Sequence, residues 1–158
     1  MTIPANVAQF LGERVLLIVT GTQVGKVYAV GGGSVVELAA ISVTAPHDLQ
    51  GRSFLARHAV KNRTSSLPYI KKQLVRVPFL RDIEKRLLTI LRTSTYTSNY
   101  IFSPDGLAKH IAELVPRQLA NVVRPIIFGN YARFNPLRLI KKIKDQQEKR
   151  AKQQFSRS

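Results

Sequence analysis

An uninterrupted apolar run near the start of the chain most constrains the fold. Residues 15–19 read Val-Leu-Leu-Ile-Val, and Thr20-Gly21 follows. A short apolar run that ends in turn residues predicts a buried strand. Two more strand patterns follow at 24–30 and 34–43, and the glycines at 31–33 between them supply the positive φ of a tight turn. The first 45 residues are therefore predicted to form a three-stranded antiparallel meander.

The second half of the chain alternates helix and strand patterns. A helix is predicted to begin at Pro78, because apolar residues recur there every three or four positions. The later elements are a strand at 100–103, a helix capped by Ser103, a helical turn at 116–121, a strand at 122–128 with Pro125 at an edge, and a last helix from Asn135-Pro136. The order predicts an α/β fold with a mixed sheet, an antiparallel meander and then α-β-α-β-α, as in ribonuclease-H-like folds.

The length and the patterns predict one domain with two polar additions. A polar, basic stretch without clear periodicity occupies residues 44–77 and is predicted to be a loop insertion. The apolar positions of the last helix end at Ile143, so residues 145–158 are predicted to be a basic, polar helical tail. The domain itself is predicted to span residues 1–144.

The positive charge is confined to the last two thirds of the chain. The formal net charge is +16, whereas residues 1–50 hold only two basic and three acidic side chains. Residues 51–100 hold 11 basic and 2 acidic side chains, and residues 101–158 hold 12 and 4. Such an asymmetry predicts a positive face that attracts polyanions and releases their counterions. The predicted partner is ribosomal or other structured RNA. The alternatives are an anionic membrane surface and a solvated face without a partner.

Two groups of basic residues are the candidate RNA-binding sites. The first lies in the predicted loop, and the second shares the last helix with its apolar positions, where Arg138, Lys141 and Lys142 fall on one face and Lys144 is displaced from it. The predicted binding residues are Arg52, Arg57, Lys61, Arg63, Lys71, Lys72, Arg138, Lys141, Lys142 and Lys144.

Several function classes find no support in the sequence. There is no cysteine, and His47, His58 and His110 lie too far apart for a common metal spacing, so no metal or other cofactor is predicted. No hydrolase or metalloprotease motif occurs, and we expect no catalytic residue. The first residues lack the pattern of a signal peptide, and no apolar run is long enough for a membrane helix. A cytoplasmic protein is expected, and its oligomeric state stays open.

Two segments carry a family resemblance. Residues 79–88 read Phe-Leu-Arg-Asp-Ile-Glu-Lys-Arg-Leu-Leu, and Tyr-Ile-Phe-Ser-Pro-Asp follows at 100–105. Residues 114–119 read Leu-Val-Pro-Arg-Gln-Leu, and 128–140 read Phe-Gly-Asn-Tyr-Ala-Arg-Phe-Asn-Pro-Leu-Arg-Leu-Ile. Together they resemble the bacterial proteins required for attachment to host cells, which are related to the central domain of archaeo-eukaryotic peptide-chain release factors. The resemblance implies that domain's fold and an association with ribosomes and translation.

The sequence departs from release factors at their catalytic tripeptide. Release factors carry Gly-Gly-Gln in the loop after the first three strands, whereas residues 48–53 here read Asp-Leu-Gln-Gly-Arg-Ser. A non-catalytic protein that binds RNA or the ribosome is therefore the predicted function. The alternatives are a stand-alone factor that hydrolyses peptidyl-tRNA and an interaction protein in host attachment.

Overall fold

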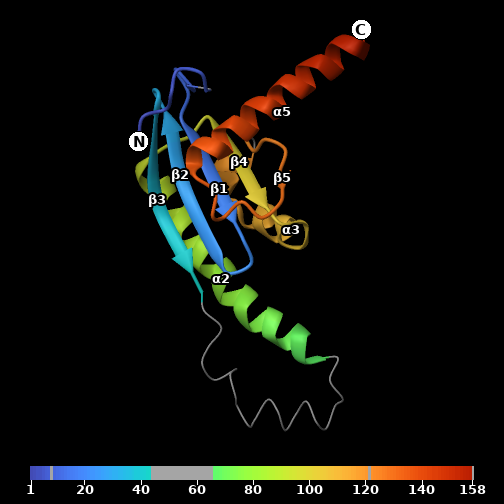
Figure 1. Cartoon of the computed structure of the whole chain (residues 1–158). Helices are drawn as coiled ribbons and strands as arrows, with labels where there is room; N and C mark the ends of the chain where they lie inside the picture. The colour runs from blue at the N-terminus through green and yellow to red at the C-terminus, as the bar shows by residue number, and fades with distance from the viewer. Residues whose placement is uncertain (8, 44–65, 121, 158) are drawn as a thin grey trace.

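The chain folds into a five-stranded mixed sheet that lies between two layers of helices (Figure 1). A computed structural model describes residues 1–7, 9–43, 66–120 and 122–157, with the backbone alone at 66–76, 118, 120 and 157. Strands β1 (Val15–Thr20), β2 (Val24–Gly31) and β3 (Ser34–Ser42) form the predicted antiparallel meander. Strand β4 (Ser98–Ser103) pairs with β1 in parallel, and β5 (Ile127–Phe128) pairs with β4 in parallel. The order β3-β2-β1-β4-β5, followed along the chain by α-β-α-β-α after the meander, confirms the predicted fold class.

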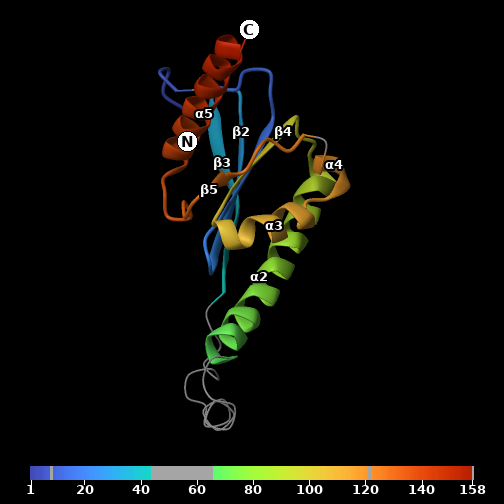
Figure 2. The same ribbon diagram turned by 90° about the vertical axis from the view of Figure 1, so that its right-hand side faces the viewer.

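Alternate residues of the central strand enter two separate cores. All six residues of β1 are buried. Leu17 and Val19 pack toward helix α5 (Pro136–Arg157), whereas Leu16 and Ile18 pack toward the opposite layer. That layer holds α2 (Ser66–Thr93), α3 (Asp105–Leu114) and the short α4 (Arg117–Ala120), as Figure 2 shows edge-on. The apolar run at 15–19 is thus explained by a strand that is covered on both faces.

Helix α2 begins earlier than the sequence indicated. Pro78 lies inside the helix, and the first turns, at 66–77, occupy part of the segment that was predicted to be a loop. Phe79, Ile83 and Leu87 are fully buried against the sheet, while the earlier turns extend beyond its edge (Figure 1). The apolar residues whose spacing predicted the helix form the face that packs on the sheet. Among the residues of α2 described with side chains, this face starts at Phe79. The backbone of the helix begins at Ser66, so the prediction of a start at Pro78 was wrong.

The start of α3 and the strand at 122–128 also differ from the prediction. Ser103 is the last residue of β4, and its buried hydroxyl accepts a hydrogen bond from Thr20 Oγ1 at 2.8 Å. Pro104 occupies the cap position without a side-chain hydrogen bond, so Ser103 is not the cap. The predicted last strand is split into a bridge from Val123 to Asn99 and the two residues of β5, and Pro125, which has no amide N–H, lies between the two.

Candidate nucleic-acid interface

The first three turns of α5 are fixed on the sheet. Asn135 caps the helix as predicted, since its Oδ1 accepts a hydrogen bond from the Leu137 amide at 2.9 Å. Leu139, Ile140 and Ile143 have no exposed surface and join the core that contains Leu17, Val19 and Tyr100. Because this apolar face is buried, the opposite face of the helix must point to solvent.

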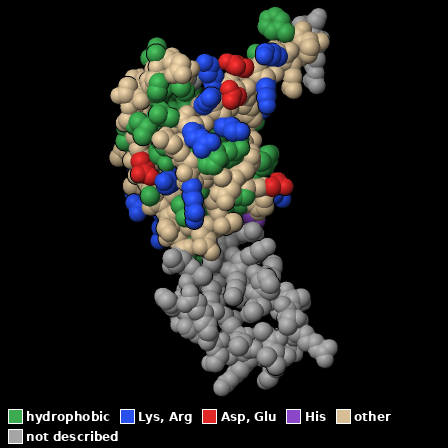
Figure 3. Space-filling view, in the orientation of Figure 1, with side chains coloured by type: hydrophobic (Ala, Val, Ile, Leu, Met, Phe, Trp, Pro, Cys, Tyr) green, Lys and Arg blue, Asp and Glu red, His purple; other side chains and the backbone are tan. Residues whose placement is uncertain are grey.

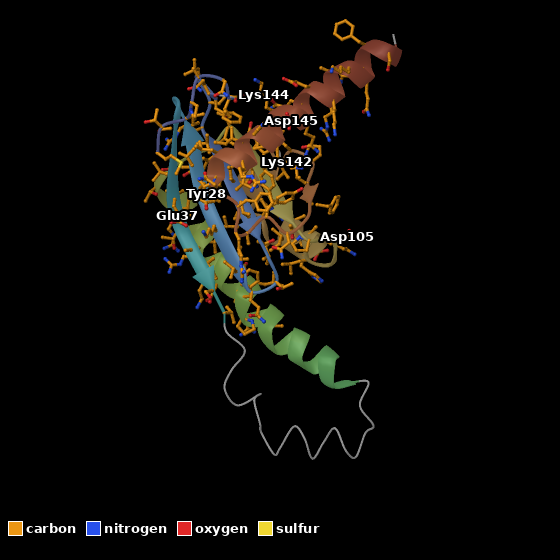
Figure 4. The ribbon with its side chains drawn as sticks, viewed as in Figure 1. Tyr28, Glu37, Asp105, Lys142, Lys144 and Asp145 are labelled. Atoms are coloured by element: carbon orange, nitrogen blue, oxygen red, sulfur yellow. The ribbon has the colours of Figure 1, made fainter. Side chains whose placement is uncertain are left out.

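Three of the four predicted cations of α5 lie on that solvent face. Arg138, Lys141 and Lys142 are exposed. Lys144 is displaced toward the N-terminal segment, where its Nζ donates a hydrogen bond to the Asn6 carbonyl at 3.2 Å. Figure 4 shows Lys142 and Lys144 at different positions around the helix. The helix therefore offers a basic face of three residues, Arg138, Lys141 and Lys142, and uses the fourth to hold the N-terminal segment.

An aromatic cluster in the loop before α5 lies under two of these cations. The Arg138 guanidinium carbon lies 4.5 Å from the centroid of the Phe134 ring, and Lys142 Nζ lies 5.6 Å from that of Tyr131. The two rings pack edge-to-face with centroids 5.0 Å apart, and Tyr131 packs in the same way on the buried Phe102 at 5.6 Å. Cation–π contacts of this kind hold a charged group over a ring face. The basic face is thus positioned by packing on both the helix and the loop.

A glycine lets this loop approach the sheet. A Cβ at Gly21, directly after β1, would lie 3.0 Å from Asn130 Oδ1 and 3.1 Å from Ala132 Cβ. Both contacts are tighter than side chains normally tolerate, so the loop at 129–135 can close over the end of β1 because position 21 has no side chain. A side chain at position 21 would therefore crowd the loop that carries the aromatic cluster.

The other predicted binding residues are not brought to this face. Arg52, Arg57, Lys61 and Arg63 lie outside the described residues. The backbone at Lys71 and Lys72 belongs to the turns of α2 that extend beyond the sheet, at the opposite end of the molecule from the projecting end of α5 (Figure 1). The predicted RNA-binding residues therefore fall in two separate regions, and only the one on α5 is described with side chains.

Sequence reasoning missed a pocket beside the basic face. Its volume is about 360 Å³, and Tyr131 and Ile127 line it together with residues of α5 beyond Lys144. Among these are Lys149 and Lys152, which belong to the predicted basic, polar tail at 145–158 and were not among the predicted binding residues. The usable signal was their spacing, because positions 142, 149 and 152 recur on one side of a helix.

A second pocket, of about 450 Å³, lies over β2 and β3. It is lined by Tyr28, a tyrosine whose pKa is raised. Burial raises the pKa of the Tyr28 phenol above its usual value, and the carboxylate of Glu37 raises it further. Glu37 is its cross-strand partner, and the two are labelled in Figure 4. The phenol is therefore neutral at pH 7 and has no general-base character there.

The described residues contain neither a metal-binding cluster nor a membrane-spanning helix. No three His, Asp or Glu side chains in this part of the chain gather into a group that could hold a metal ion. None of the helices traced in residues 66–120 and 122–157 is long and apolar enough to cross a membrane.

The fold and the site define an α/β domain with a packed basic helix on one face of a mixed sheet. No protein-family model matches the sequence, and no curated protein matches it. Among solved structures, the chain is similar to the archaeal translation termination factor aRF1, with a TM-score of 0.48 and 8% sequence identity. The similarity covers 91% of this chain and 41% of that one, so this chain spans less than half the length of the factor. The resemblance to the host-attachment family stays a prediction.

Proposed function

We propose that this protein binds RNA through the basic face of α5 and does not act on it as an enzyme. The observation that carries the proposal is the exposure of Arg138, Lys141 and Lys142 on a helix whose other face is fully buried. Cations on a packed helix lose less conformational entropy when phosphates bind than the same cations on a flexible tail. They therefore contribute more to the free energy of binding.

Two further features support RNA rather than a solvated surface. Figure 3 shows Lys and Arg side chains gathered over the part of α5 that lies on the sheet. Within the residues described with side chains, the cations of the basic face form no ion pair with a carboxylate, so their charge is not neutralised. Aromatic rings beside arginine and lysine are also the setting in which single-stranded bases stack. The expected partner is ribosomal or other structured RNA that contains unpaired segments.

The test removes the three charges and compares the result with an equal loss elsewhere. Changing Arg138, Lys141 and Lys142 together to Gln is expected to weaken binding of single-stranded RNA at 50 mM salt by more than about tenfold. If each cation meets one phosphate, the slope of log K against log salt concentration should become shallower by about 2.1. The control changes Arg81, Lys85 and Arg86 to Gln. These residues are exposed on α2, on the other side of the sheet, and carry the same total charge.

The control shows whether a loss of affinity comes from contacts at α5 or from the lower net charge of the protein. If both triple variants lose affinity equally, the attraction is non-specific and the α5 face is not the site. Affinity that is unchanged in the α5 variant places any binding surface outside α5. Fluorescence anisotropy with a labelled single-stranded RNA and sedimentation with ribosomes, each at low and high salt, measure these outcomes.

A further inference from the structure

The pocket beside the basic face combines three kinds of side chain. Tyr131 and Ile127 supply an aromatic and apolar surface, and both pack on the core beneath them. Lys142, Lys149 and Lys152 line the pocket from α5. The helix also contributes two exposed carboxylates to the lining, Asp145 and Glu148.

The position of these residues on α5 is regular. Positions 142, 149 and 152 are separated by seven and three residues, which places the lysines along one side of the helix. The carboxylates at 145 and 148 lie between them, and Lys142 and Asp145 are labelled near each other in Figure 4. On a helix, a carboxylate can form an ion pair with a lysine four residues later, which here would join Asp145 to Lys149 and Glu148 to Lys152. Yet no such ion pair forms within the described part of α5, so both signs of charge face the pocket unpaired.

The chemistry of the pocket matches one kind of ligand. An aromatic ring face stacks on a nucleobase, ammonium groups bind phosphate, and a carboxylate accepts hydrogen bonds from an exocyclic amine such as the cytosine N4 amine. The volume of about 360 Å³ is within the range of small-ligand sites. A base in a duplex already uses its Watson–Crick edge, so only an unpaired base can present that edge to the carboxylates.

We propose that this pocket binds one unpaired RNA nucleotide whose base carries an exocyclic amine. Tyr131 stacks on the base, the lysines hold the flanking phosphates, and Asp145 and Glu148 accept hydrogen bonds from the amine. This inference rests on the proposed RNA binding and adds selectivity for the base to it.

The first experiment varies the RNA and leaves the protein unchanged. Binding is measured by fluorescence anisotropy for three oligonucleotides of about ten residues, a length typical of single-strand sites. They are oligo-C, oligo-U and an oligo-C with abasic nucleotides at its centre. Cytosine and uracil differ at position 4 by an amine in place of a carbonyl oxygen. We expect oligo-C to bind on the order of tenfold more tightly than either of the others, since each loses a base-specific contact while keeping the phosphates.

The second experiment varies the carboxylates. The variant Asp145→Asn with Glu148→Gln is expected to remove the preference for oligo-C over oligo-U, and to bind oligo-U at least as tightly as the wild type. The control is Asp82→Asn with Glu84→Gln, an equal change of charge at exposed positions of α2, and it is expected to keep the preference. Circular dichroism of both variants shows whether each one remains folded.

The outcomes distinguish this inference from the proposed function. If oligo-C, oligo-U and the abasic oligonucleotide bind equally well, the pocket does not read a base, although RNA binding stands. A preference for oligo-C that persists in the Asp145 and Glu148 variant also overturns the assignment. If none of the three binds at 50 mM salt, the proposed function itself fails.

Discussion

Helices α2 and α5 cover opposite faces of the same sheet, and each extends beyond it at one end (Figures 1 and 2). Among the residues described with side chains, the fully buried positions of α2 lie at Phe79 and beyond, whereas those of α5 lie in its first turns and end at Ile143. Their exposed faces differ. On α2, Asp82 and Glu84 are interspersed with the basic residues, whereas the first exposed turns of α5 carry Arg138, Lys141 and Lys142 without an acid.

The comparison shows that packing of a helix does not by itself bring aromatic rings to its cations. Both helices hold cations in a fixed register, but among the residues described with side chains only those of α5 lie over the aromatic rings of a neighbouring loop. The first charge of opposite sign on α5 is Asp145, which lines the pocket together with Lys142. Mutation of buried residues can measure whether the two helices contribute equally to the core, and truncation can locate where the packed part of α5 ends.

The largest effect is expected in the two cores. Phe79→Ala should lower the free energy of unfolding by about 3–5 kcal/mol, because the fully buried ring packs on Gly25, where a Cβ would lie only 3.2 Å from it. Leu139→Ala, in the opposite core, should cost about 2–5 kcal/mol. Urea denaturation measures both. A cost below about 1 kcal/mol for either would show that its helix is not part of the core.

The cap of α5 should have a smaller effect. Asn135→Ala is expected to cost about 1 kcal/mol, since the Leu137 amide loses its acceptor, whereas Asn135→Ser should retain most of the stability. Thermal unfolding of the two variants beside the wild type checks the difference. Equal stability of the Ala and Ser variants would contradict the cap.

The boundary of the packed part of α5 can be located by truncation. A chain that ends after Gln147 should unfold within about 0.5 kcal/mol of the full chain, because the later residues described with side chains are exposed. A chain that ends after Lys144 should lose about 1 kcal/mol more, because Gln147 Nε2 donates a hydrogen bond to the Tyr100 hydroxyl at 2.8 Å. Chemical denaturation compares the two. Equal stability would place the boundary before Asp145.

The smallest effect concerns Tyr28 and appears only at high pH. Burial and Glu37 raise the pKa of Tyr28 in the folded state, so the folded protein keeps a proton that the unfolded chain releases near pH 10. The stability from this shift is complete below about pH 10 and is lost as the pH rises through the folded pKa. Unfolding free energies between about pH 8 and 11 should decline less steeply for Tyr28→Phe than for the wild type. Identical slopes would show that the shift is absent.

Much of the fold was determined by patterns that are local in the sequence. The run at 15–19 predicted a buried strand, and Gly32 and Gly33 do adopt positive φ values of 56° and 79° in the turn between β2 and β3. The Asn135 cap and the burial of Ile140 and Ile143 also followed from spacing alone, whereas Leu139 is fully buried in place of the predicted Leu137, which is only partly buried. These features depend on residues a few positions apart, so a single sequence contains their physical cause.

The tertiary structure decided the features that join distant residues. Ser103 is a good helix cap by itself, but Thr20 reaches its hydroxyl from a strand 83 residues away, and the helix begins without it. The backbone of α2 before Pro78 extends beyond the sheet, and those turns were not predicted from the sequence (Figure 1). Likewise, Tyr131 meets Lys142, and the pocket forms beside them, where the loop at 129–135 packs closely over Gly21 at the end of β1. Charge and periodicity therefore determined that the last helix carries cations on one face. Contacts between distant parts of the chain decided which of those cations lie over aromatic rings and beside a pocket.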